Sequence, residues 1–165
     1  MSEPTEQDLA HLRKAIRLSE SALARGERPF GAVLVSASGQ VLAETETRAD
    51  ADRDGTSHAE TNALRAAWQR ASPAEIAKST MYASGEPCPM CAGAMVQLGI
   101  RRVIFGISWQ VNRPFLNAAL GLAPRPSVSC RDVFRLAPEP IEVIGPMLED
   151  EAKAPFEAYA ARAKR

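Results

Sequence analysis

Apolar side chains first recur at helical spacing near the N-terminus. The positions that share this spacing are Leu9, Leu12, Ile16 and Leu23. The preceding stretch Thr5–Asp8 has the character of a capping box, and Gly26 is a residue type that commonly ends helices. The pattern therefore predicts a first helix between Thr5 and Gly26.

The pattern then changes to that of short strands. Gly31–Ser36 and Gln40–Thr45 are separated by Ser38–Gly39, which predicts a β-hairpin. Arg48–Thr56 follows as a polar loop that contains three aspartates. Three more strands are predicted at Thr80–Ser84, Arg102–Phe105 and Ile141–Ile144.

Further helices are predicted at Ser57–Ala71, Pro87–Gly99 and Glu149–Lys164. Pro87 should open the second of these because proline suits a first helical turn, and Pro155 should kink or interrupt the third because it has no N–H to donate. Ser108–Pro140 contains five prolines and is the least predictable segment. Helices that alternate with short strands predict a three-layer α/β/α domain with a mixed sheet.

Composition narrows the class of protein. The chain has 165 residues, of which 45% are hydrophobic, enough for one core and one domain over residues 1–165. Lys plus Arg and Asp plus Glu each number 20, so no basic excess favours nucleic acid. No apolar run is long enough to span a membrane, and no signal peptide is recognisable. With three cysteines, two of them three positions apart, we expect a metal-binding cytoplasmic protein.

One histidine and two cysteines form the strongest chemical signal. His58 lies upstream of the string Pro87-Cys88-Pro89-Met90-Cys91. An imidazole and two thiolates leave the fourth position of a tetrahedral zinc ion open for water, which is typical of a catalytic site. A helix beginning at Pro87 would place the sulfurs of Cys88 and Cys91 on one face, where first-turn N–H groups stabilise thiolates.

Glu60 lies two positions after His58, and on an ideal helix their side chains would point about 200° apart. The two can serve one metal site if His58 occupies the cap or first turn and the metal lies over that helix end. Glu60 would then reach a water molecule at the open position rather than the metal. The pattern H-x-E followed by P-C-x-x-C is the signature of zinc nucleobase deaminases.

The match extends to four strings, which occur in the order found across the cytidine deaminase-like superfamily. They are Arg28-Pro29-Phe30-Gly31-Ala32-Val33, His58-Ala59-Glu60-Thr61-Asn62-Ala63-Leu64, Gly85-Glu86-Pro87-Cys88-Pro89-Met90-Cys91-Ala92-Gly93-Ala94-Met95 and Arg102-Val103-Ile104-Phe105-Gly106. The chain most resembles the guanine deaminase and tRNA adenosine deaminase branch, from about Leu9 to Ile107.

The resemblance implies a five-stranded sheet flanked by helices, one zinc ion per chain and a homodimer. It also implies the reaction, in which zinc lowers the pKa of water and Glu60 moves a proton to a ring nitrogen and then to the leaving amine. A catalytically silent zinc-binding module is the alternative from another class. Glu60 argues against it, because a structural zinc site needs no carboxylate beside an open position.

Two departures from the branch bear on the substrate. Thr47 stands where an asparagine usually contacts the substrate ring, and Gly106–Arg113 lacks the second acid of guanine deaminases. Both departures argue against guanine. A small-molecule heterocyclic amine such as isoguanine, cytosine or an aminotriazine is therefore favoured. A tRNA-specific adenosine deaminase remains the alternative, although acids are mixed into the terminal helix.

The predicted substrate pocket draws on four parts of the sequence. Its candidate residues are Phe30, Thr47, Ala59, Ser84, Gly85, Glu86, Trp109 and Asn112. A core role for Phe30 and surface roles for Trp109 and Asn112 are equally plausible. Trp68 is expected in packing or in a dimer contact, and Cys130 is expected to be a packed thiol rather than a ligand.

Overall fold

A computed structural model of the chain describes residues 3–124, 126 and 128–163. The helices are α1 (Glu6–Ala24), α2 (Ala59–Trp68), α3 (Pro73–Ala77), α4 (Pro89–Leu98), α5 (Trp109–Leu120), α6 (Cys130–Phe134) and α7 (Glu149–Ala163). The strands are β1 (Gly31–Val35), β2 (Val41–Glu46), β3 (Thr80–Gly85), β4 (Arg102–Ile107) and β5 (Glu142–Ile144). Lys164, which the sequence pattern included in the terminal helix, lies outside the described residues.

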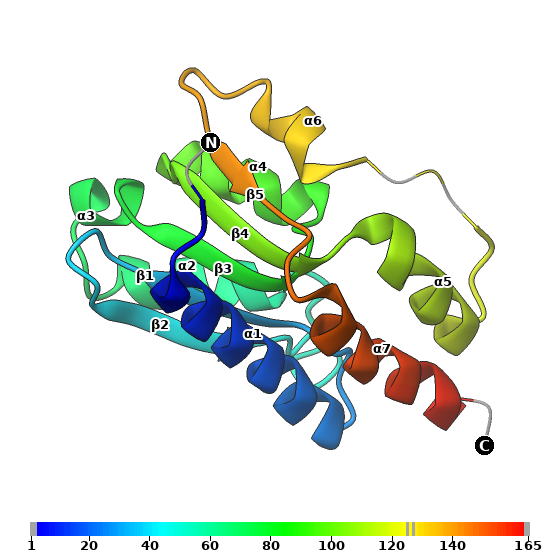
Figure 1. The fold of residues 1–165 in the computed structure, drawn as a ribbon. Helices are drawn as coiled ribbons and strands as arrows, with labels where there is room; N and C mark the ends of the chain where they lie inside the picture. The colour runs from blue at the N-terminus through cyan, green and yellow to red at the C-terminus, as the bar shows by residue number, and fades with distance from the viewer. Residues whose placement is uncertain (1–2, 125, 127, 164–165) are drawn as a thin grey trace.

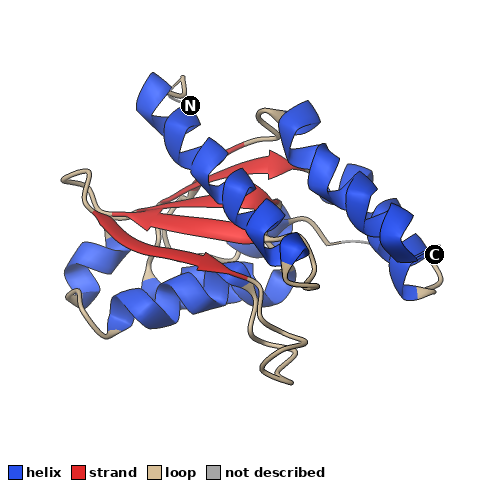
Figure 2. Ribbon diagram, turned by 90° about the horizontal axis from the view of Figure 1, so that it is seen from below, coloured by secondary structure: helices blue, strands red, loops and turns tan. Residues whose placement is uncertain are grey.

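The five strands form one mixed sheet in the order β2-β1-β3-β4-β5. β1 is antiparallel to both β2 and β3, whereas β4 is parallel to β3 and β5. The predicted hairpin is confirmed, and so is the three-layer arrangement. Figure 2 shows the sheet between helices on its two faces.

Each face of the sheet has its own hydrophobic core. On one face, α2, α3, α4 and α6 bury small and aliphatic side chains against the strands. On the other, α1, α5 and α7 contribute a cluster that includes Leu12, Trp109 and Phe156. In Figure 1, α1 and α7 cross this second face, and α5 lies beside α7. The site described below lies at the N-termini of α2 and α4, and α5 lines the cavity beside it.

A buried carboxylate fixes α1 to the sheet. Asp8 completes the predicted capping box with Thr5 and also accepts hydrogen bonds from Tyr82 (2.6 Å) and Arg102 (2.7 and 3.0 Å). Burial raises the pKa of Asp8, but the hydrogen bonds from Arg102, Tyr82 and Thr5 outweigh it, so the pKa lies well below its usual range. One carboxylate therefore joins α1, β3 and β4.

The second ligand helix begins at Pro89, not at Pro87 as expected. Cys88 is its N-cap, with an extended backbone (φ −68°, ψ 165°), and Gly99 ends it in a left-handed conformation as predicted. A residue before proline is pushed out of the helical region, so Cys88 cannot be helical ahead of Pro89. Pro87 therefore lies in the connection from β3.

Two of the helices contain an internal proline. α7 continues through Pro155, so the expected interruption does not occur. Its buried face, which includes Ala152 and Phe156, packs against the sheet and offsets the lost hydrogen bond. α5, with Pro114 inside it, was not predicted. No helix in the described part of the chain is long and apolar enough to cross a membrane.

Candidate active site

Three side chains that can bind a metal converge at two helix N-termini. His58 is the N-cap of α2, Cys88 is the N-cap of α4, and Cys91 lies in the first turn of α4. Cys88 Sγ lies 3.5 Å from both His58 Nδ1 and Cys91 Sγ, and Cys91 Sγ lies 3.6 Å from His58 Nδ1. The metal would therefore lie over both helix ends, as the sequence predicted for His58.

The spacing of these atoms fits zinc. Ligands at about 2.0–2.3 Å around a tetrahedral zinc ion lie roughly 3.3–3.8 Å apart. All three ligand-to-ligand distances fall within this range. Hydrogen bonds from Cys91 and His58 lower the pKa of Cys88 to about 4, which favours the thiolate form that binds metal. His58, Cys88 and Cys91 thus form a candidate zinc site.

Glu60 lies beside this site but is not one of its three candidate ligands. It is in the first turn of α2, is 4% exposed, and has one carboxylate oxygen 3.5 Å from Cys91 Sγ. Burial and the charge of Cys88 raise its pKa to about 7. A carboxylate in this environment can both accept and release a proton near neutral pH.

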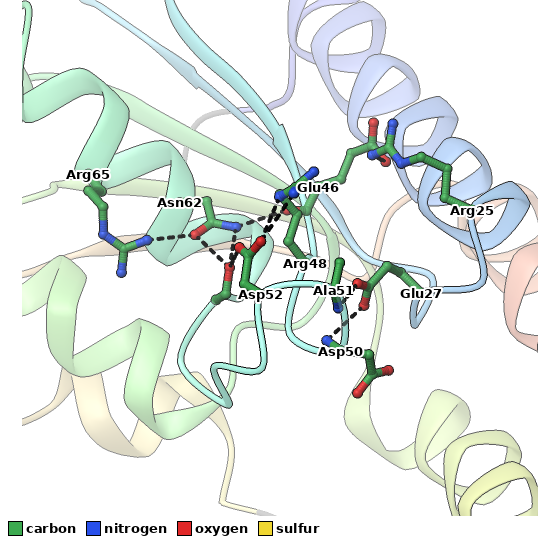
Figure 3. Close-up of polar contacts among 10 residues, drawn as sticks. Arg25, Glu27, Glu46, Arg48, Asp50, Ala51, Asp52, Asn62 and Arg65 are labelled. Carbon is green, nitrogen blue, oxygen red and sulfur yellow. Dashed lines mark hydrogen bonds and ion pairs between the residues drawn. The ribbon is translucent and has the colours of Figure 1, made fainter.

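The loop before His58 is held by polar contacts that Figure 3 shows. Glu27 accepts hydrogen bonds from the backbone N–H groups of Asp50 (3.2 Å) and Ala51 (2.7 Å). Asp52 pairs with Arg48 and accepts a hydrogen bond from Ser57 Oγ at 2.8 Å. The aspartates of this loop therefore brace the chain that leads into α2, next to the metal site.

On the α2 side, the Asn62 amide donates to the backbone oxygen of Glu46 at 3.0 Å. This bond ties the first turns of α2 to the end of β2. It fixes the helix end that carries His58 and Glu60 relative to the sheet.

A cavity of about 200 Å³ opens beside the metal site. It is lined by Arg28, Phe30, Thr47, His58, Glu60, Glu86, Cys88, Trp109, Arg113, Leu116, Asn117, Leu120 and Leu122. Its volume is below the roughly 300–1,000 Å³ of pockets that hold drug-sized ligands. A small planar ring next to Glu60 fits this space better than a large ligand.

Glu86 holds one wall of the cavity in place. Its buried carboxylate accepts hydrogen bonds from the backbone N–H groups of Trp109 (3.0 Å) and Cys130 (3.1 Å) and from Ser129 Oγ (2.5 Å). Trp109 and Cys130 are the first residues of α5 and α6, so a negative charge lies at both helix N-termini. The residue next to Pro87 therefore anchors both helices beside the metal site.

Four of the predicted pocket residues line the cavity: Phe30, Thr47, Glu86 and Trp109. Thr47 is 2% exposed, and its hydroxyl has no hydrogen-bond partner among the described residues. Such a hydroxyl is available to a ligand. Phe30 also packs against Trp109 and Phe156, so it belongs to the core as well.

The other four predicted pocket residues lie behind the lining. Ala59 O accepts a hydrogen bond from Thr45, and Ser84 accepts one from the N–H of Gly31. A Cβ at Gly85 would lie 3.0 Å from the Phe30 ring, so Gly85 allows this ring to pack closely. Asn112 is fully buried, and its amide has no partner among the described residues. Contact of these four with substrate stays a prediction.

Most lining residues that the sequence did not predict come from α5. They are Arg113, Leu116, Asn117 and Leu120, with Arg28 and Leu122 from neighbouring loops. The sequence does not predict these residues because Pro114 interrupts the local pattern of a helix, so α5 itself was not predicted. Arg28 belongs to the string Arg28-Pro29-Phe30-Gly31-Ala32-Val33, in which the sequence predicts a pocket role for Phe30 alone.

Comparison with known proteins agrees with this geometry. Residues 5–107 match the family model described as the cytidine and deoxycytidylate deaminase zinc-binding region. The chain is 40% identical over 158 residues to a "probable cytosine deaminase" of Schizosaccharomyces pombe, which covers 96% of this chain and 95% of that protein. It is 38% identical over 104 residues to a "tRNA-specific adenosine deaminase" of Haemophilus influenzae, covering 63% of this chain and 60% of that protein.

Solved structures share the fold. One from a study of A-to-I editing by tRNA:A34 deaminases superimposes with a TM-score of 0.70 at 26% identity, covering 89% of this chain and 99% of that one. A guanine deaminase from Nitrosomonas europaea superimposes with a TM-score of 0.73 at 22% identity, covering 98% and 87%. The five-stranded α/β/α architecture is therefore common to all three.

Proposed function

The chain belongs to the cytidine and deoxycytidylate deaminase family of zinc-binding enzymes, and from that premise we propose that its substrate is a free nucleobase-like heterocycle whose exocyclic amino group is released as ammonia. One observation carries this proposal. The buried carboxylate of Glu60 lies beside the candidate zinc site, and both open into a cavity of about 200 Å³.

The proposed roles follow from the geometry. His58, Cys88 and Cys91 hold the metal, which when bound lowers the pKa of water and so supplies a nucleophile at neutral pH. Glu60 takes one proton from the attacking water and delivers it to a ring nitrogen, and it then takes the second proton of the same oxygen and delivers it to the departing amine. The carbon that bears the amino group gains the water oxygen and loses ammonia. Phe30 and Trp109 enclose the ring and exclude bulk water.

A free base is supported by the size of the cavity and by the chain's neutral charge. A tRNA substrate requires a surface that neutralises several phosphates, and this chain has equal numbers of acidic and basic residues. The "probable cytosine deaminase" aligns over nearly the whole chain. The tRNA-specific relatives keep adenosine in tRNA as the second candidate.

Guanine is expected to be a poor free base. The hydroxyl of Thr47 is shorter than the carboxamide usual at that position, and it offers one donor where a carboxamide offers two. The segment 106–113 supplies no carboxylate to the cavity. Cytosine, an amino-purine other than guanine, or an aminotriazine fits these groups better.

The proposal also covers the assembly and the compartment. We expect residues 1–165 to act as one cytoplasmic deaminase domain that forms a homodimer. Trp68 on α2 is 53% exposed and is our candidate for the dimer contact. Sedimentation of the wild type and of Trp68→Ala would test it, because the variant should shift toward monomer.

A competition assay tests the substrate class. Zinc-loaded protein is given a tRNA anticodon stem-loop together with free cytosine, amino-purines and aminotriazines. Ammonia release from at least one free base, with the stem-loop adenosine unchanged, supports the proposal. Rapid inosine formation in the stem-loop with no free base consumed would support the tRNA alternative instead.

A further inference from the structure

Two arginines line the cavity that contains Glu60. Arg28 comes from the loop between α1 and β1, and Arg113 comes from the second turn of α5. The Nε atoms of both are buried and have no hydrogen-bond acceptor among the described residues. A buried donor without an acceptor is unfavourable, and a ligand that brings an acceptor relieves this cost.

The charge of these two arginines is poorly neutralised by the protein. Arg113 stacks over the Trp109 ring, with its guanidinium carbon 5.1 Å from the ring centroid, and makes no ion pair among the described residues. Among the described residues Arg28 has one ion-pair partner, Asp50, at the long distance of 3.5 Å and with a side chain that is 62% exposed. Exposed ion pairs of this kind contribute little.

The two carboxylates that line the cavity, those of Glu60 and Glu86, contact groups other than the two arginines. Glu86 accepts three hydrogen bonds from the ends of α5 and α6, and Glu60 lies against Cys91 at the metal site. The whole chain has no net charge, so a general basic excess does not explain two cations in one small cavity. The cavity thus holds two guanidinium groups and two carboxylates that no ion pair joins among the described residues, so a buried Nε–H of each arginine is left for a ligand.

We propose that the substrate, the free heterocycle of the proposed function, carries an oxyanion on its ring that Arg28 and Arg113 bind while the amino group faces Glu60. This inference rests on the proposed function and narrows its substrate class. A guanidinium presents N–H groups in a planar fork that matches a carboxylate or a phosphate. The cavity favours a carboxylate attached directly to the ring, because about 200 Å³ leaves little room for a sugar phosphate.

Binding of inert ring compounds tests this inference without turnover. Calorimetry with the zinc-loaded protein would compare uracil with uracil-5-carboxylate, uracil-6-carboxylate and uridine 5′-monophosphate. One of the two carboxylates should bind at least about tenfold more tightly than uracil, as expected for charge-assisted hydrogen bonds. This preference should shrink as salt is raised, because salt screens the partly exposed guanidinium groups.

Variants connect the preference to the two arginines. Arg28→Gln and Arg113→Gln should each weaken carboxylate binding more than uracil binding, whereas Arg113→Lys should keep part of the preference. Arg135→Gln is the matched control, because Arg135 is exposed, pairs with Asp132 and is not one of the residues that line the cavity. Zinc content and unfolding temperature would show that each variant is folded.

Each outcome decides between the accounts. Equal or undetectable binding of uracil and both carboxylates would overturn the inference, as would a preference that survives in both glutamine variants. Tightest binding of the monophosphate would also overturn it, because the group bound by the arginines would then be a phosphate ester and not an oxyanion on the ring. Stem-loop binding that alone depends on the arginines would assign them to RNA and overturn the inference. Ammonia release from neutral cytosine would leave the proposed function standing in every one of these cases.

Discussion

The carboxylate of Glu86 accepts a 3.0 Å hydrogen bond from the backbone N–H of Trp109, the first residue of α5. Glu86 directly precedes Pro87 and Cys88, so the strand end that leads to a metal ligand also anchors the helix that forms the cavity wall. The ring of Trp109 lines that cavity. The geometry of the metal site and the shape of the pocket are thus joined through one buried side chain.

Replacing this carboxylate should disturb the pocket but not the metal. Glu86→Gln loses the negative charge and leaves a backbone N–H of α5 or α6 poorly paired, which we expect to cost about 2 kcal/mol of stability. The value of kcat/KM should fall about tenfold or more, mainly through KM, because α5 shapes the ring pocket. Zinc content should stay at one per chain.

Glu149→Gln is the matched control for this change. Glu149 accepts hydrogen bonds at 3.3 Å from the backbone N–H and the hydroxyl of Ser108, the N-cap of α5, through one carboxylate oxygen. An amide oxygen can replace this carboxylate oxygen. A small effect in Glu149→Gln and an equal loss of kcat and zinc in Glu86→Gln would show that Glu86 is only structural.

The hydroxyl of Thr47 should matter for the substrate and not for folding. Thr47→Val removes a buried hydroxyl that has no partner in the described chain, so the free energy of unfolding should not fall. Turnover should drop about tenfold if this hydroxyl contacts the ring. Thr45→Val is the converse control, because its hydroxyl donates to Ala59 O at 2.7 Å and its loss should cost about 1 kcal/mol. Equal stability loss in both variants would contradict this assignment.

Substitution of two buried cysteines distinguishes a metal ligand, Cys91, from a thiol packed in the core, Cys130. Cys91→Ser should lower bound zinc well below one per chain, because a hydroxyl is a poor ligand for zinc beside a thiolate and an imidazole. Cys130→Ser should keep full zinc, because Cys130 is packed at the start of α6. Zinc would be counted by atomic absorption on purified protein. Loss of zinc from Cys130→Ser alone would reverse the assignment.

Much of the fold could be predicted from local patterns. The capping box of Thr5 and Asp8, the Ser38–Gly39 hairpin and the sheet strands all depend on short-range spacing, which the sequence displays directly. The position of His58 at a helix cap could also be predicted. It followed from the need to bring two residues of opposite helical faces to one metal.

The remainder depended on tertiary packing or on competing proline rules. Pro89 overrode Pro87 in starting α4, because it forces Cys88 into an extended conformation. α5 forms around Pro114 because its buried face packs on α7, which no local spacing revealed. The Arg113 side of the pocket was consequently missed. The partners of Glu86 at two helix ends are more than 20 positions away, beyond any local pattern.

The carboxylate of Asp8 predicts how stability depends on pH. Its folded pKa is depressed, so its contribution is present above the unfolded value of about 4 and is lost as the pH falls through the folded value. Asp8→Asn should lower the free energy of unfolding by about 2 kcal/mol or more at pH 7, because Arg102 loses its charged partner. The difference from wild type should shrink below about pH 4. A difference that stays constant from pH 7 to pH 3, in urea unfolding curves, would contradict the account.

Ammonia release by matched zinc-loaded proteins tests the central claim most directly. Wild type and Glu60→Gln would be incubated with free cytosine, amino-purines and aminotriazines, with zinc content measured on the same samples. We predict that wild type releases ammonia from at least one free base and that Glu60→Gln keeps its zinc while turnover falls by at least about 100-fold. No ammonia from any free base, or undiminished turnover by zinc-loaded Glu60→Gln, would contradict the account.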